Sequence, residues 1–236
     1  MKDQDKQPKH ARLTREIAGK ILTGEYAVGH RLPVEADLIE RYQVSRTALR
    51  EGLRTLAAKG FVVSRKRLGT MVNDRSLWNL LDSDVLSWMD NTDIQADFLQ
   101  QVGEARLIFE PEAARLAAQR ATAAQVAEIE RAFLAMKSAV AKDDRIDADL
   151  AFHVGILAAS QNHVLQNFGA IIGTALRASF EISDQATASY DNTLDLHGAV
   201  LQAIRLQDDA KAREQMFELL KKSVTDLGLQ DVSQHA

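Results

Sequence analysis

Polar and apolar residues over the first 45 positions repeat at the spacing of helices. Leu13, Ile17 and Ile21 recur at every fourth residue and form one apolar stripe on a first helix. Glycines at positions 24 and 29 and a proline at position 33 interrupt this pattern. The sequence after the proline predicts a short second helix over residues 35–42.

A third helix and a β-hairpin follow. The third helix is predicted over residues 46–59, with Ser45 as a favourable N-cap. Its buried face should consist of Leu49, Leu53 and Leu56. Residues 61–64 and 70–72 are β-prone runs on either side of a basic turn. Three helices and a two-stranded wing are typical of a winged helix-turn-helix.

The remainder of the chain has apolar positions at a period of 3.6 residues and no strand pattern. The predicted helices span residues 81–89, 95–119, 123–141, 145–160, 163–182, 188–206 and 208–227, with Thr122 and Asp144 as expected helix starts. About seven helices joined by short loops predict an all-α antiparallel bundle.

These patterns predict a mainly α fold with two domains. We expect a flexible N-terminus over residues 1–9 and a winged helix-turn-helix over residues 10–74. A linker over residues 75–80 should lead to an all-helical domain over residues 81–228. Residues 229–236 should form a flexible tail.

The composition excludes several classes of protein. Hydrophobic residues make up 46% of the 236 positions, which is enough for a packed core, but no run of 18 apolar residues predicts a membrane span. The first ten residues lack the apolar segment of a signal peptide. The absence of cysteine excludes disulfides, thiolate metal sites and cysteine nucleophiles. We therefore expect a cytoplasmic protein without a membrane partner.

The net charge of −4 conceals a basic head. Residues 1–75 contain 16 Lys and Arg against 9 Asp and Glu, whereas residues 76–236 contain 13 against 24. This asymmetry suggests that only the head meets a polyanion, although basic runs are more often simply solvated faces. The positions of individual arginines have to decide between contact with a polyanion and a solvated basic surface.

Three arginines, Arg46, Arg50 and Arg54, lie on the face of the third helix opposite its leucines. The second helix of a helix-turn-helix enters the major groove with its N-terminal residues against the base edges. Arg46 and Arg50 are therefore candidates for bidentate hydrogen bonds to guanine, and Arg54 is expected at phosphate or solvent. A solvated basic helix is the alternative that this helix alone leaves open.

The residues around this helix supply further information. They are Gly24-Glu25-Tyr26, Gly29, Leu32-Pro33, Glu35, Val44-Ser45-Arg46-Thr47, Arg50-Glu51, Leu53, Leu56, Gly60, Gly69-Thr70 and Val72. In this order they resemble the winged helix-turn-helix of the GntR family of bacterial regulators. The resemblance implies a double-stranded DNA operator, with bases read by Arg46 and Arg50 and supported by Ser45 and Thr47. It also implies that a wing with Arg67, Gly69 and Thr70 enters the minor groove.

Two positions depart from the pattern of that family. Ala36 stands where many members have a DNA-contacting arginine, so one contact is missing. The wing tip is Lys66-Arg67-Leu68 instead of a glycine-rich turn, and Arg67 could restore a contact in a narrow minor groove. The operator is therefore expected to differ from those of better-known members.

The helical half has its own set of recurring residues. They are Glu104-x-Arg106-x-x-x-Glu110, Ala117-Ala118, Asp149-x-x-x-His153, Asn162 and His197. They resemble the C-terminal ligand-binding domain, of the FCD type, in the FadR-type branch of the GntR family. A segment from Trp78 to Trp88 further resembles the subgroup that senses sugar acids such as galactonate and hexuronates. We expect the two tryptophans to pack between head and body.

One pair in this half points to a metal. Asp149 and His153 lie four residues apart on one predicted helix, so both side chains project to the same place. With His197 from a distant helix they predict a site for one divalent ion, zinc, nickel or manganese, with positions left open for an effector. A surface Asp–His pair, or direct hydrogen bonds to a polyhydroxy ligand, are the alternatives. Metal-binding members of the family have another histidine in the last helix, where this chain has Leu219.

Two arginines lie on predicted core-facing stretches of helix. Arg106 and Arg177 each need an anionic partner, because a buried guanidinium is costly when unpaired. For Arg106 the partner is either Glu104 or Glu110 in an internal salt bridge or the carboxylate of an effector, and we favour the effector. We add Arg177 and Asn162 to Arg106 as candidate effector-binding residues.

Taken together, the sequence predicts a transcription regulator and not an enzyme. We expect a homodimeric repressor that a small carboxylate, such as an aldonate or uronate, releases from a pseudo-palindromic operator. One alternative is a metal-dependent enzyme built on Asp149, His153 and His197, although no HExxH motif or nucleophile constellation is present. The others are a related regulator that responds to an acyl-CoA or another organic acid, and a DNA-compacting protein without an effector.

Overall fold

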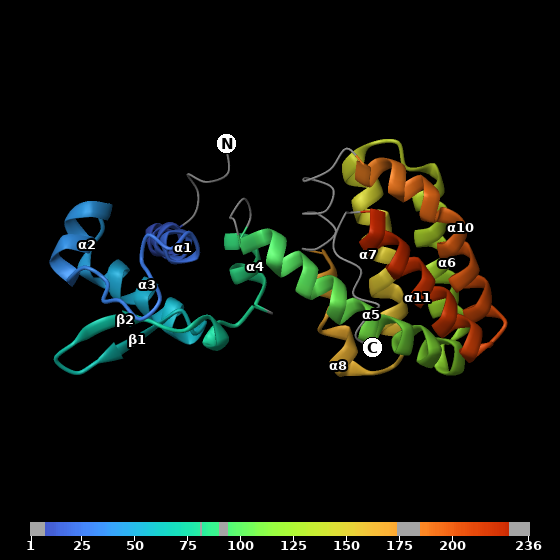
Figure 1. Ribbon diagram of the computed structural model, residues 1–236, viewed down its shortest axis with the longest axis horizontal. Helices are drawn as coiled ribbons and strands as arrows, with labels where there is room; N and C mark the ends of the chain where they lie inside the picture. The colour runs from blue at the N-terminus through green and yellow to red at the C-terminus, as the bar shows by residue number, and fades with distance from the viewer. Residues whose placement is uncertain (1–7, 81, 90–93, 174–184, 227–236) are drawn as a thin grey trace. The chain divides into compact units, whose positions relative to one another are not determined.

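The structure is a computed structural model that describes residues 8–80, 82–89, 94–173 and 185–226. The chain divides into two compact units, residues 1–95 and residues 96–236 (Figure 1). The described residues are mainly helical, with one two-stranded sheet in unit 1. The predicted fold class, a winged helix-turn-helix followed by an all-helical domain, is therefore confirmed.

Unit 1 begins with the three predicted helices. They are α1 (Lys9–Leu22), α2 (Glu35–Tyr42) and α3 (Arg46–Ala58). The apolar stripe of α1 is buried as expected, because Leu13, Ile17 and Ile21 are each at most 2% exposed. On α3 the expected face is buried at Leu49 and Leu56, whereas Leu53 is only partly buried.

The wing is an antiparallel hairpin of β1 (Val62–Arg65) and β2 (Gly69–Val72). Its base lies in the core of unit 1, where Val62 pairs with Val72 and both are buried. An isolated bridge between Arg31 and Met71 attaches the loop before α2 to the outer strand. The hairpin is therefore anchored at its base and exposed at its tip.

The residues after the wing pack onto the head instead of forming a free linker. A short 3-10 helix, η2 (Arg75–Leu77), and α4 (Ser83–Met89) both belong to unit 1. Phe61 stacks on Trp78 at 4.7 Å between ring centroids and meets Trp88 edge-on at 5.8 Å. Both tryptophans thus pack inside unit 1. The division between the units falls after Gln95 and not at residues 75–80.

A buried lysine adds ionic contacts to this packing. The Nζ atom of Lys59, at the end of α3, lies 2.5 Å from Asp82 Oδ1 and 2.9 Å from Asp84 Oδ2. The same amine lies 5.6 Å from the ring centroid of Trp88. Asp82 also accepts a hydrogen bond from the Asp84 amide, so it caps the start of α4 while it pairs with the lysine.

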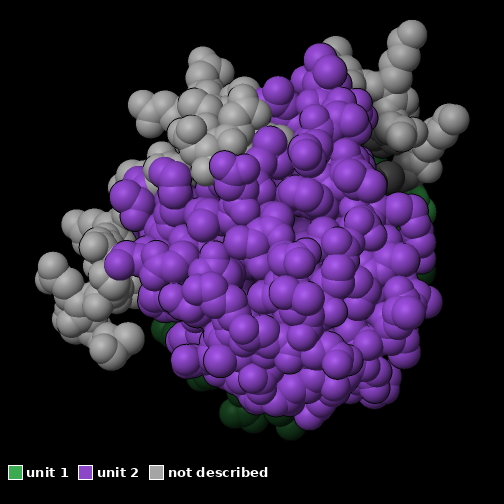
Figure 2. Space-filling view, turned by 90° about the vertical axis from the view of Figure 1, so that its right-hand side faces the viewer, with its two compact units in different colours: residues 1–95 green, residues 96–236 purple. Residues whose placement is uncertain are grey.

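Unit 2 is a helical bundle, seen as a compact body in Figure 2. Its helices are α5 (Ile94–Arg120), α6 (Ala123–Ser138), α7 (Lys142–Ala159), α8 (His163–Gln166), α10 (Gln185–Arg205) and α11 (Asp209–Asp226). α6 packs against α7 and α10 against α11, and α10 also packs against α6 (Figure 1). The long helix expected over residues 163–182 is interrupted by a turn at residues 167–168, and its part beyond residue 173 lies outside the described residues.

Local capping signals account for some of the described helix ends and not for others. Thr122 caps α6 in a reciprocal capping box with Gln125. α7, however, starts after Ala141. Asp144, the helix start expected from the sequence, lies within the first turn instead. An acidic residue there is favourable because it faces the positive end of the helix dipole.

The core of unit 2 is continuous across its helices. Among the described residues, α5 contributes four buried alanines to it, with Leu107 and Phe109 packed against the core, and small side chains let neighbouring helices approach closely. Larger residues from the other helices fill the centre: Ile129, Phe152, Leu157, Val200, Met216 and Leu219. None of the described helices combines the length and apolarity needed to cross a bilayer. The expected flexible tail, and all but the last two residues of the expected flexible N-terminus, lie outside the described residues.

Candidate functional site

The first candidate site is the exposed face of α3. Ser45 caps this helix by accepting a hydrogen bond from the Ala48 amide at 3.1 Å, so its hydroxyl orients the first helical turn. Arg46 and Thr47 follow on that turn, and Arg50 lies one turn further; all three are exposed. The N-terminal turn of α3 therefore presents the residues that a groove-reading helix uses.

Two arginines of α3 make ion pairs on the surface. Arg50 Nε lies 3.5 Å from Glu35 Oε2, and Arg54 Nη1 lies 2.8 Å from Glu51 Oε1. Exposed pairs of this kind contribute about 0–1 kcal/mol to stability, so they can exchange for contacts with DNA at little cost. Arg50 and Arg54 thus each have an acidic partner on the exposed surface of unit 1.

The wing tip exposes positive charge on a strained turn. Arg67 has φ of 67°, in the left-handed region that most residues avoid. Gly69 has φ of 87°, and a β carbon there would lie 2.8 Å from Arg31 Nε, so glycine makes room for that side chain. Lys66 and Arg67 are exposed, while Thr70 in β2 is half-buried.

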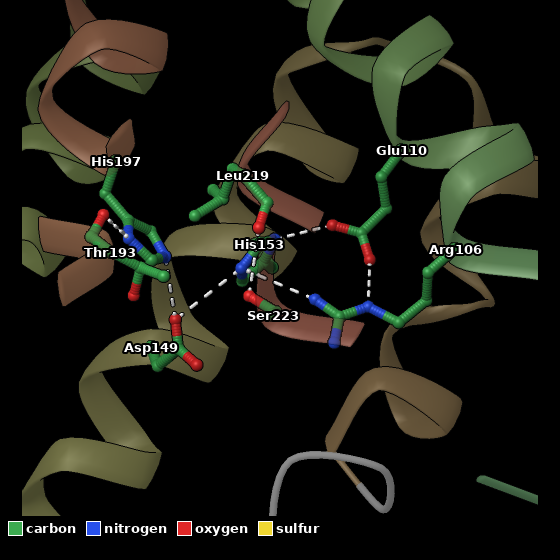
Figure 3. A network of polar contacts seen from close by, with 8 residues as sticks. All are labelled: Arg106, Glu110, Asp149, His153, Thr193, His197, Leu219 and Ser223. Atoms are coloured by element: carbon green, nitrogen blue, oxygen red, sulfur yellow. Dashed lines mark hydrogen bonds and ion pairs between the residues drawn. The ribbon is translucent and has the colours of Figure 1, made fainter. Parts of the chain in front are cut away.

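The second candidate site is a group of polar residues buried in unit 2. Four helices each contribute two residues that are four positions apart, which places both on one face of the helix. The pairs are Arg106 and Glu110 on α5, Asp149 and His153 on α7, Thr193 and His197 on α10, and Leu219 and Ser223 on α11 (Figure 3). We call Arg106, Glu110, Asp149, His153 and His197 the buried cluster, because none of them is more than 8% exposed.

In both histidines of the cluster, Nδ1 contacts an oxygen of another residue, and Nε2 faces the carboxylate of Asp149. His197 Nδ1 lies 2.8 Å from the Thr193 carbonyl oxygen, and His153 Nδ1 lies 2.5 Å from Glu110 Oε2. Their Nε2 atoms lie 3.0 Å and 3.5 Å from Asp149 Oδ1 (Figure 3). A neutral imidazole with its proton on Nδ1 has a lone pair on Nε2. These contacts are hydrogen bonds when Nε2 carries a proton; when neither Nε2 does, two lone pairs and a carboxylate oxygen converge, an arrangement that a cation between them would stabilise.

The charges of the cluster depend on one another. Burial alone would lower the pKa of His153, but the carboxylates of Glu110 and Asp149 outweigh it and raise this pKa to about 9. Burial would raise the pKa of Glu110, yet Arg106 and His153 lower it to about 2. The pKa of Asp149 is lowered in the same way by the two histidines. Both carboxylates are therefore ionised, and the cluster favours a positive charge at its centre.

The donor atoms of the cluster fit a divalent metal. Atoms from Asp149, His153 and His197 all lie within 4.8 Å of one another. Two imidazole nitrogens and a carboxylate oxygen suit zinc, nickel or manganese. Histidines that bind metals usually donate their other N–H to a carboxylate or a carbonyl, as both do here. The three predicted residues thus come together, and the alternative of a surface pair for Asp149 and His153 is wrong because both are buried.

Arg106 forms an internal ion pair, which is one of the two interactions that the sequence leaves open for it. Its Nε donates to Glu110 Oε1, and its Nη2 lies 3.4 Å from His153 Nε2. Glu104, the other candidate partner, instead accepts a hydrogen bond from Gln100 Nε2 at 3.4 Å. Because the ion pair uses Nε, the Nη2 atom of Arg106 remains directed at His153, one of the metal-ligand candidates.

Leu219 lies in the same part of the bundle. It is fully buried on α11, and Figure 3 shows its side chain near the two histidines. An aliphatic side chain offers no ligand atom. Three side chains are therefore the donor set that the described residues provide.

Among the described contacts, none joins Asn162 to the buried cluster. Asn162 caps α8, where its side-chain oxygen accepts hydrogen bonds from the amides of Val164 and Leu165. Its amide is thus used locally, and an effector-binding role has no support in its contacts. Arg177 lies outside the described residues.

Sequence reasoning missed two members of the network. Glu110 was recognised only as a possible partner of Arg106, although it also holds His153. The spacing of Glu110 from Arg106 was a usable signal, but nothing local predicted a contact across 43 residues. Thr193 contributes a backbone carbonyl to His197, and a backbone atom leaves no trace in the residue type.

Comparison with family models accounts for both halves of the chain. A model described as bacterial regulatory proteins of the gntR family matches residues 9–72, and a model described as an FCD domain matches residues 101–222. The matches cover the two candidate sites separately. They also leave α4 and the segment before it outside both models.

Individual relatives and a solved structure agree with the family models. The chain is 34% identical over 220 residues to the galactonate operon transcriptional repressor of Escherichia coli, covering 92% of this chain and 95% of that protein. It is 33% identical over 171 residues to the Glc operon transcriptional activator of Escherichia coli, covering 70% and 65%. The solved structure of Escherichia coli McbR/YncC has the same fold, with a TM-score of 0.51, 16% identity and coverage of 94% of this chain and 98% of that one.

Proposed function

We propose that this chain, which belongs to the GntR family of bacterial regulatory proteins and carries an FCD domain, is a repressor released from DNA by a small hydroxycarboxylate. Membership of the family makes the protein a DNA-binding transcription regulator. It also removes the metal-dependent enzyme as an interpretation of Asp149, His153 and His197. The effector, the metal and the sign of regulation are the parts that we propose.

The DNA-binding part of the proposal rests on the exposed face of α3. Arg46 and Arg50 would each grip a base edge in the major groove, worth about 1–3 kcal/mol of discrimination, with Ser45 and Thr47 holding the first turn in place. Arg67 would enter the minor groove at the wing tip, beside Gly69 and Thr70. A homodimer would present two such heads to a pseudo-palindromic operator.

The metal part rests on the buried cluster. Asp149, His153 and His197 would hold one divalent ion, which in regulators of this kind would supply a Lewis-acidic point for an oxygen of the effector. The three side chains leave coordination positions open because Leu219 contributes no ligand. Zinc, nickel and manganese all accept this donor set.

The observation that carries the effector proposal is the charge of the cluster. Arg106 and Glu110 cancel each other, and Asp149 supplies one negative charge against two positive charges of a divalent ion. The loaded cluster therefore keeps one excess positive charge among its described residues, in a buried place. One carboxylate would neutralise it, and the terminal nitrogens of Arg106 are placed to receive that group.

A hydroxyl beside the carboxylate would occupy a second open position at the ion. Galactonate, whose operon the 34% identical relative represses, has both groups on adjacent carbons. Aldonates, uronates and simple hydroxy acids share a carboxylate with nearby hydroxyls, whereas an acyl-CoA places its negative charge on phosphates. We therefore favour a sugar acid over an acyl-CoA.

Release from DNA requires only that the effector prefers one arrangement of the two heads. A preference of about 1–3 kcal/mol is typical of such coupling. The Glc operon relative is an activator by name, so the direction of regulation has to be measured for this protein.

Thermal unfolding of the zinc-loaded protein with single compounds tests the proposal. D-Galactonate, D-gluconate, D-glucuronate, D-galacturonate and L-lactate should include at least one that raises the unfolding temperature and releases DNA. The same compound should have no effect on the Arg106→Met variant, which keeps the volume of the side chain without its charge. Stabilisation by an acyl-CoA alone would overturn the hydroxycarboxylate assignment.

A further inference from the structure

Glu110 binds two partners at once. Its Oε1 accepts from Arg106 Nε, and its Oε2 lies 2.5 Å from His153 Nδ1. The side chain is 1% exposed, so both oxygens are shielded from bulk solvent. One carboxylate therefore joins the candidate effector-binding group on α5 to a candidate metal ligand on α7 (Figure 3).

The contact with His153 determines which nitrogen of the ring is available. Because a carboxylate accepts but does not donate, the ring has to place a proton on Nδ1. Nε2 is then the atom left for a metal, and it is the atom that points toward Asp149 Oδ1 and the His197 ring. Without Glu110, the ring would be free to take the other tautomer or to rotate.

The contact with Arg106 gives the Glu110 carboxylate a second fixed partner, so its other oxygen stays directed at His153. Arg106 supplies the compensating charge from one turn away on the same helix. The guanidinium thus has a second role besides the proposed reception of an effector.

We propose that Glu110 is the positioning residue of the metal site, which fixes His153 with its proton on Nδ1 and its Nε2 available to the ion. This inference rests on the proposed metal site of Asp149, His153 and His197. It adds a residue that touches neither metal nor effector. It also explains why α5 and α7 approach each other through charged side chains within an otherwise apolar bundle.

Zinc titration of the full-length, metal-stripped protein tests the inference without an effector. Glu110→Gln keeps the shape but removes one acceptor and the charge, so we expect zinc affinity to fall about 10–100-fold, as for other outer-sphere partners of metal-binding histidines. Glu104→Gln, on the same helix, is the matched control and should bind zinc like the wild type. Circular dichroism verifies that each variant is folded.

The single variant leaves the buried Arg106 without its anionic partner, which destabilises the fold. For this reason the decisive comparison is between Arg106→Met and the double variant Arg106→Met/Glu110→Met, which has no uncompensated cation and no side-chain acceptor for His153 Nδ1. The double variant should bind zinc at least about tenfold more weakly than Arg106→Met. Equal affinities of these two variants would overturn the positioning role.

Nuclear magnetic resonance of the imidazole nitrogens supplies a readout that a purely structural role would not change. In zinc-loaded wild type, His153 should carry its proton on Nδ1 and show the shift of a metal-bound nitrogen at Nε2. In the double variant the Nδ1 proton signal should broaden or disappear while that of His197 persists. A wild type that binds no zinc would instead refute the proposed metal site itself, and a retained His153 signal in the double variant would refute only the inference about Glu110.

Discussion

Gly60 and Leu77 approach so closely that a β carbon on residue 60 would lie 1.9 Å from the carbonyl oxygen of Leu77. Gly60 also has φ of 82°, a conformation that side chains rarely adopt. The close approach lets the segment after the wing fold back onto the end of α3. There the amide of Asn79 donates to the carbonyl of Lys59 at 3.0 Å.

Gly60→Ala should therefore destabilise unit 1. The left-handed conformation alone costs about 1–2 kcal/mol, and the backbone contact has to open as well, so we expect a loss of at least about 3 kcal/mol. Urea unfolding followed by tryptophan fluorescence measures it, because both tryptophans of the chain, Trp78 and Trp88, pack in unit 1. Gly24→Ala is the control, since Gly24 has φ of 78° but open space around it and should lose only the conformational part. Equal losses in the two variants would contradict the close approach.

Lys59→Met should also weaken unit 1. The lysine side chain is 13% exposed and pairs with Asp82 and Asp84, so its removal leaves a partly buried carboxylate without its cation. We expect a loss of about 1–2 kcal/mol, less than for a fully buried pair. Lys66→Met, on the exposed wing tip, is the matched control and should change stability by no more than about 0.5 kcal/mol.

The contribution of this ion pair should depend on pH in a defined direction. Burial would raise the pKa of Asp82, but hydrogen bonds from Lys59 and the backbone lower it below its ordinary value. A group with a lowered pKa contributes fully above the pKa of the unfolded chain, about 4, and the contribution disappears as the pH falls through the folded value. The stability difference between wild type and Lys59→Met should therefore be constant near neutral pH and shrink in acid. A difference that is unchanged at pH 3 would exclude Asp82 as the partner that matters.

Substitutions on α3 should separate base reading from general attraction to DNA. Arg46→Ala and Arg50→Ala should each cost about 1–3 kcal/mol on a sequence that the wild type selects from a random pool, and much less on scrambled DNA. Arg54→Ala, next on the same face, should weaken both by similar amounts and lower the salt dependence. Fluorescence anisotropy at two salt concentrations measures these quantities. If Arg54→Ala lost more selectivity than Arg46→Ala, the assignment of the groove-facing turn would be wrong.

Leu219→His should add a fourth ligand to the metal site. The position is fully buried on α11, where metal-binding members of the family have a histidine, so the metal-free variant should be less stable than wild type, because an unpaired polar ring is buried there. Zinc should restore that stability and bind more tightly than to the wild type. Leu220→His is the control, because Leu220 is equally buried but one residue further round α11, and it should lose stability without a gain in zinc affinity.

Much of the fold follows from local patterns. The helix periodicity, the Ser45 and Thr122 caps and the alternation of the wing act over one or two turns, so they predict elements to within a few residues. The errors lie where packing overrides them. Asp144 is a good helix start in isolation, yet α7 begins three residues earlier, and Leu53 belongs to the apolar stripe of α3 but is only half-buried.

The candidate sites also contain some features that local spacing predicts and others that depend on packing between helices. The row of arginines on α3 and the Asp149–His153 pair were visible in the sequence because residues one turn apart share a face of any helix. The partner of Arg106 could not be chosen from the sequence, because Glu104 and Glu110 are both near it along the chain. The choice of Glu110 depends on where α7 places His153.

The sequence by itself therefore determined which residues stand together on each helix, from the arginine face of α3 to the acid–histidine pair of α7. Only the tertiary structure decided which of these faces meet. It brought Glu110 between Arg106 and His153, and it packed Trp78 and Trp88 onto Phe61 within the head. The physical reason is that spacing along a helix is set by local backbone geometry, whereas contacts between helices depend on how side chains fill the space between them.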